Sequence, residues 1–106
     1  MNSRVTTKLD EFYCGIMAFG TQAYTHFGVV DYATLAASAI NLLIKRGEIS
    51  PSEKRDYSNY MLKKFDDAIG GRMNWSDINT IVDYMEGVSD INKNVAGIMA
   101  AIEMAR

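Results

Sequence analysis

The feature that most constrains this chain is a long stretch almost without charge. From Phe12 to Ile44 the only formally charged residue is Asp31, although charged residues make up 23% of the sequence. A helix on the surface of a soluble protein normally keeps charged side chains on its outer face. The stretch 12–44 must therefore be covered by the rest of the fold, by another protein subunit or by lipid.

Lipid is the least suitable cover for this stretch. A transmembrane helix needs about 20 consecutive, mostly apolar residues. Residues 12–30 are interrupted by polar side chains such as Gln22 and His26, and residues 32–44 are too few to span a bilayer. The N-terminus lacks the basic start and the apolar run of a signal peptide. We therefore expect a cytoplasmic protein that does not enter a membrane.

The spacing of apolar residues indicates helices and no strands. Apolar side chains recur at three- and four-residue steps along most of the chain. The pattern predicts five helices, over residues 6–27, 32–46, 51–69, 75–86 and 90–105. With 106 residues, of which 48% are hydrophobic, the chain is expected to form one domain, residues 1–106. The predicted fold class is all-α, a compact helical bundle.

Capping residues define the ends of the predicted helices. The segment Ser50-Pro51-Ser52-Glu53 is the clearest start, because it combines a serine N-cap, a proline at the first helical position and a glutamate at the third. The expected N-caps of the other helices are Thr6 or Thr7, Asp31, Asn74 or Ser76, and Ser89. Glycine at Gly47 and at Gly70-Gly71 is expected to end the second and third helices.

Two helices without surface charge are difficult to bury within one small chain, because three flanking helices can cover one central helix but hardly two. Ala33 and Ala37 form a small-residue surface that lets another helix approach closely. Tyrosines also suit interfaces, since an apolar ring carries a polar tip. We therefore expect the uncharged hairpin, residues 12–44, to form an apolar protein interface, most simply that of a homo-oligomer, a dimer or higher. The expected interface residues are Tyr13, Tyr24, Tyr32, Ala33 and Ala37.

Basic residues cluster around the turn between the second and third predicted helices. These candidate contacts for an anion or a nucleic-acid phosphate are Lys45, Arg46, Lys54 and Arg55. Acidic residues interleave them, which favours a solvated loop over an anion site. The net charge of −2 and the pI near 5.3 also disfavour non-specific binding to nucleic acid.

The sequence contains no catalytic or metal-binding constellation. His26 is the only histidine, and no cysteine or carboxylate lies three or four residues away from it. Cys14 lies twelve residues before His26, about 18 Å along a continuous helix, too far for a nucleophile and its base. A single cysteine also excludes an intrachain disulfide. We therefore expect no enzymatic activity, no cofactor and no metal ion.

These observations together predict a non-enzymatic interaction protein, a small helical regulator, adaptor or inhibitor of a larger protein, which self-associates through the uncharged hairpin. Two alternatives remain open. One is a small-ligand binding protein of the nucleotide type, in which an oligomer interface brings Tyr24 or Tyr32 near Lys45 or Arg46. The other is a DNA-binding regulator that uses the basic turn 45–56.

Overall fold

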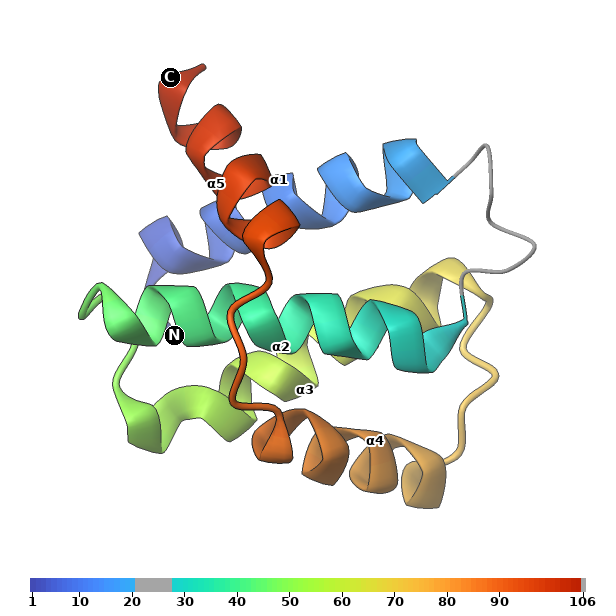
Figure 1. The fold of residues 1–106 in the computed structure, drawn as a ribbon. Coiled ribbons are helices and arrows are strands. Elements are labelled where there is room, and N and C mark those ends of the chain that lie inside the picture. Colours follow the sequence, from blue (N-terminus) through green and yellow to red (C-terminus); the bar gives the residue numbers. More distant parts are fainter. Residues whose placement is uncertain (21–27, 106) are drawn as a thin grey trace.

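The computed structural model describes residues 1–20 and 28–105 as helices joined by loops (Figure 1). The helices are α1 (Ser3–Gly20), α2 (Val29–Lys45), the short 3-10 helix η2 (Pro51–Glu53), α3 (Lys54–Ala68), α4 (Trp75–Gly87) and α5 (Lys93–Met104). The described residues include no strand. The prediction of an all-α bundle of about five helices is confirmed for these residues, which form five α-helices.

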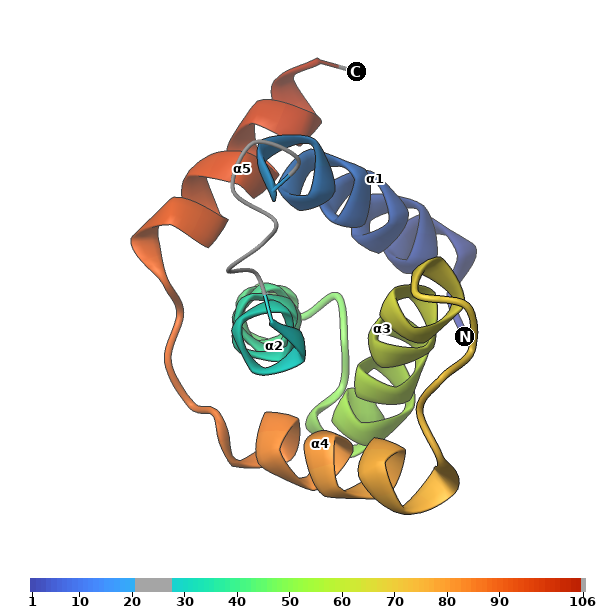
Figure 2. The same ribbon diagram turned by 90° about the vertical axis from the view of Figure 1, so that its right-hand side faces the viewer.

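α2 is the central helix of the bundle. Viewed along its axis, it is surrounded by α1, α3, α4 and α5 (Figure 2). Nine of its residues are buried, and the five consecutive residues from Ala36 to Ile40 are all among them, so every side of the helix is covered. A helix that is apolar all round is stable only when it is buried. The other helices of the same chain therefore account for the absence of charge in this part of the hairpin.

α1 buries one face only. Val5, Leu9, Phe12 and Ile16 follow one another at three- and four-residue steps, and each is at most 4% exposed. Cys14, on another side of the helix, is exposed. In its described part α1 is therefore an amphipathic helix, whose other side the rest of the described chain leaves uncovered.

Several predicted helix ends are confirmed. The Ser50 and Glu53 side chains form the predicted capping box, and the Asn74 side chain caps α4. Gly47 lies just after α2 with a φ of 79°, and Gly70 and Gly71 follow α3 with φ of 91° and 68°. Glycine adopts these left-handed conformations at low cost, which explains its position after a helix.

The starts of the first two helices differ from the prediction. α1 already begins at Ser3, and the hydroxyls of Thr6 and Thr7 donate back to the Ser3 carbonyl at 3.1 and 2.7 Å instead of capping. Gly28 is the N-cap of α2, so Asp31 lies in the first turn, where its carboxylate complements the positive helix end. Residues 21–27, the predicted last part of the first helix, lie outside the described residues.

α5 begins three residues later than predicted because residues 88–92 form a linker without helical structure. Asn92 rather than Ser89 is the N-cap, and its side-chain oxygen accepts a hydrogen bond from the Asn94 backbone amide at 2.7 Å. The linker runs along α2, where the Asn41 side chain donates to two linker carbonyls at 2.9 and 3.0 Å. These bonds satisfy backbone groups that no helix satisfies.

Candidate interaction surfaces

Three of the five predicted interface residues lie in the core. Tyr32, Ala33 and Ala37 are each 0% exposed. The Tyr32 hydroxyl donates to the Met61 carbonyl at 2.6 Å, and burial raises the pKa of this phenol well above its usual value of 10. The prediction that these residues face a partner is wrong, because α2 is enclosed and a second chain cannot reach them in this fold.

The other two predicted interface residues are the tyrosines nearer the N-terminus. Tyr13 is partly buried, with its ring edge-on to that of Tyr32 at a centroid distance of 6.0 Å. The ammonium group of Lys64 lies 5.3 Å from the centre of the Tyr13 ring and 2.9 Å from the Asp10 carboxylate. Tyr13 is therefore already in contact with α2 and α3. Tyr24 lies outside the described residues.

Two of the four predicted anion contacts form ion pairs within the chain. The Arg46 guanidinium lies 2.6 Å from the Glu103 carboxylate of α5. Arg55 pairs with Asp83 of α4 at 2.8 Å and also with Glu86. Both arginines therefore have carboxylate partners before any anion approaches.

The other two cations, Lys45 and Lys54, meet at one shallow depression. It has a volume of about 440 Å³ and is lined by both lysines, by Glu86 and by apolar residues. The Lys54 ammonium group donates to the carbonyl of Val88, the C-cap of α4, at 2.7 Å, and burial lowers its pKa. Lys45 lies in the last turn of α2. Both positive charges thus lie near the negative ends of helices, and the carboxylate of Glu86 lines the same depression.

Tyr32 and the basic residues do not meet at a common site. Tyr32 lies near the start of α2 and Lys45 at its end, thirteen residues apart in one helix, which is about 20 Å along the helix axis. Because Tyr32 is also buried, it cannot stack on a ligand that contacts Lys45 or Arg46 in the same chain. The nucleotide-type site therefore loses one of its two candidate tyrosines.

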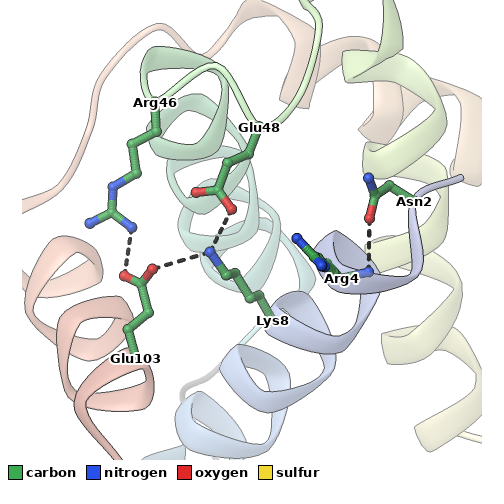
Figure 3. Close-up of polar contacts among 6 residues, drawn as sticks. All are labelled: Asn2, Arg4, Lys8, Arg46, Glu48 and Glu103. Carbon is green, nitrogen blue, oxygen red and sulfur yellow. Dashed lines mark hydrogen bonds and ion pairs between the residues drawn. The ribbon is translucent and has the colours of Figure 1, made fainter. Parts of the chain in front are cut away.

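A polar clasp, made of Lys8, Arg46, Glu48 and Glu103, ties α5 to α1 and to the end of α2 (Figure 3). The Lys8 ammonium group lies 2.5 Å from Glu48 and 3.1 Å from Glu103, which also pairs with Arg46. Hydrogen bonds from Arg46 and then from Lys8 lower the pKa of Glu103. The bond to Glu48 raises the pKa of Lys8. These ion pairs of Glu103 therefore hold α5 against α1 and the end of α2.

The outer face of α5 is exposed and carries one charge, that of Lys93 at the start of the helix. Residues Val95–Ile102 contain no polar side chain, yet Val95 and Met99 are the two buried residues of this helix. The residues exposed on the outer face are Lys93, Asn94, Gly97, Ala100, Ala101 and Met104. They are three and four residues apart, so they share one side of the helix. The sequence signal for this face is the run of eight apolar residues, which is longer than one buried helix face requires.

A second exposed apolar region lies where the start of α2 and the end of α3 meet α4. Six large apolar side chains are exposed in the described part of the chain, and two of them, Met1 and Met104, are near the chain ends. The other four are Val30, Ile69, Trp75 and Tyr84. A depression of about 250 Å³ in this region is lined by Val29, Ile69, Met73, Asp77, Thr80 and Ile81. We call this region the α4 surface.

Comparison with known proteins assigns no family. No family model, no curated protein and no solved structure matches the chain. Within residues 1–20 and 28–105, no three histidine, cysteine or carboxylate side chains are grouped so as to hold a metal ion. None of the helices in this described part combines the length and the apolar character needed to cross a membrane.

Proposed function

We propose that the chain is a non-enzymatic interaction protein, of the regulator, adaptor or inhibitor kind, and that it self-associates through the outer face of α5. The proposal rests on the contrast between composition and exposure in this helix. Of the eight consecutive apolar residues Val95–Ile102, Val95 and Met99 are buried and Ala96, Ile98 and Ile102 pack against the core, which leaves Gly97, Ala100 and Ala101 exposed. An uncharged helix face of this kind is normally covered by protein.

A second copy of the same face is a suitable cover, because its one charged residue, Lys93, lies at the start of the helix and a two-fold antiparallel pair keeps the two lysines at opposite ends. Gly97 and Ala101 are four residues apart, so two small residues adjoin and allow another helix to approach closely. A Cβ at Gly97 would meet no other part of the chain within 4 Å, which leaves this position open. In a two-fold antiparallel pair, Lys93 at the start of each helix lies near the negative end of the other.

The outer face of α5 is small for a protein interface. A contact one helix wide buries less than the roughly 800 Å² per partner that is typical of a stable interface. We therefore expect a reversible dimer with a dissociation constant on the order of tens of micromolar.

Sedimentation velocity over a range of protein concentrations tests this proposal. The wild-type protein should change from monomer to dimer as its concentration rises. Ala101→Glu should remain a monomer, because pairing would bury an unpaired charge. Ser52→Glu adds the same charge at an exposed position in η2, on the other side of the molecule from α5, and should dimerise like the wild type (Figure 1). A wild type that is monomeric at millimolar concentration, or a dimer that survives Ala101→Glu, would contradict the proposal.

A further inference from the structure

The α4 surface is separate from the outer face of α5, since α4 and α5 lie on opposite sides of α2 (Figures 1 and 2). Its depression has an aliphatic lining that includes Val29, Ile69 and Ile81, together with the side chains of Asp77 and Thr80. Asp77 is exposed and has no ion-pair partner among the described residues. The depression therefore offers an apolar cavity beside one available carboxylate.

This part of the chain is also strongly acidic. Residues 66–92 contain six carboxylates and one basic residue, Arg72, which gives a formal charge of −5. Because the whole chain carries −2, the remaining residues carry +3. Arg55 of α3 lies against Asp83 and Glu86 of α4 and offsets only one of these negative charges. Of these carboxylates only Asp77 lines the depression, while Asp66 is buried and Asp83 and Glu86 pair with Arg55. The α4 surface thus combines exposed apolar side chains with one carboxylate at the depression and a net negative charge in the surrounding segment.

We infer that the α4 surface binds a segment of another protein that presents an apolar side chain flanked by lysine or arginine. The apolar side chain fills the depression, and the flanking cation pairs with Asp77. The exposed ring of Tyr84, one helical turn after Thr80 and Ile81, offers a further face for a guanidinium or ammonium group. A second copy of this chain does not fit face to face, because two α4 surfaces would bring like charges together.

Two peptides provide the first test. One repeats the sequence Leu-Lys-Lys-Leu-Leu-Lys-Leu, and the other has glutamate in place of every lysine. Binding is followed by the fluorescence of Trp75, the only tryptophan in the chain, and is located by amide NMR shifts. The lysine peptide should bind and shift the signals of Ile69, Met73 and Ile81, whereas the glutamate peptide should bind at least about tenfold more weakly.

A matched pair of charge reversals provides the second test. Asp77→Lys and Asp90→Lys change the net charge equally, but only Asp77 lines the depression, while Asp90 is exposed in the linker after α4. Asp77→Lys should weaken binding of the lysine peptide about tenfold, and Asp90→Lys less than about threefold. Circular dichroism checks that both variants are folded.

If both charge reversals weakened binding of the lysine peptide equally, the inference would be overturned. Long-range attraction to the net charge of the protein would then explain the binding without a contact to Asp77. Absence of binding, equal affinity for both peptides, or NMR shifts located away from the α4 surface would overturn it as well. Dimerisation of each variant should be that of the wild type. The α4 inference and the proposed self-association can therefore fail independently.

Discussion

α2 and α5 are both almost uncharged, but the fold encloses one and leaves half of the other exposed. α2 has no charged residue from Tyr32 to Ile44 and buries nine of its side chains. α5 has no polar side chain from Val95 to Ile102 and buries two. The difference comes from position, because α2 has helices all around it and α5 packs against the bundle on one side (Figure 2). An uncharged run thus predicts that a helix is covered, but not what covers it.

The same substitution in the two helices should give the largest difference. Ala37→Glu places a carboxylate in the core and should lower the free energy of unfolding by about 4 kcal/mol or more, enough to unfold a small protein. Ala101→Glu, on the outer face of α5, should change it by less than about 0.5 kcal/mol. Urea unfolding followed by circular dichroism measures both values. Similar losses in the two variants would mean that α2 is not enclosed as described.

A smaller effect is expected from the buried tyrosine of α2. Tyr32→Phe removes the hydroxyl that donates to the Met61 carbonyl and should cost about 1–2 kcal/mol, because the carbonyl stays buried without a partner. Tyr84→Phe is the matched control, since it removes a hydroxyl that shares an exposed hydrogen bond with Thr34 at 2.7 Å. That control should cost a few tenths of a kcal/mol. Equal costs in urea unfolding would argue against the buried position of Tyr32.

Local signals predicted the helices well, because capping depends on neighbours in sequence. The box formed by Ser50 and Glu53 spans three residues and correctly marks the start of the third predicted helix. Even so, Gly28 caps α2 where Asp31 was expected. Gly28 caps the helix in an extended backbone conformation. Aspartate is found at N-caps more often than glycine, so the residue pattern favoured Asp31.

The surfaces were predicted less well, because they depend on contacts between distant residues. Small alanines such as Ala33 and Ala37 suit both an interface and a crowded core, and only the arrangement of the other helices shows which applies. The partner of Arg46 lies 57 residues away and that of Arg55 lies 28 residues away. Ion pairs between residues this far apart leave no repeating pattern in the sequence. The basic residues therefore appeared to have no partners within the chain.

The polar clasp, which holds α5, should give the stability of the protein a small pH dependence. Arg46 and Lys8 hold the pKa of Glu103 below its ordinary value of 4.5. A carboxylate whose pKa is lower in the folded state contributes stability above its unfolded pKa and loses it as the pH falls through the folded pKa. The melting temperature should therefore fall between about pH 5 and pH 3, and it should fall less in Glu103→Gln. Identical pH profiles of the two proteins would show that the clasp does not stabilise α5.

The most direct test of this account is the location of self-association on the chain. Amide NMR spectra recorded over a dilution series report which residues change environment as the protein concentration rises. We predict concentration-dependent shifts confined to the outer face of α5, from Asn94 to Met104, with the signals of the α4 surface unchanged. Shifts centred on the α4 surface, or no shifts up to millimolar concentration, would contradict the account.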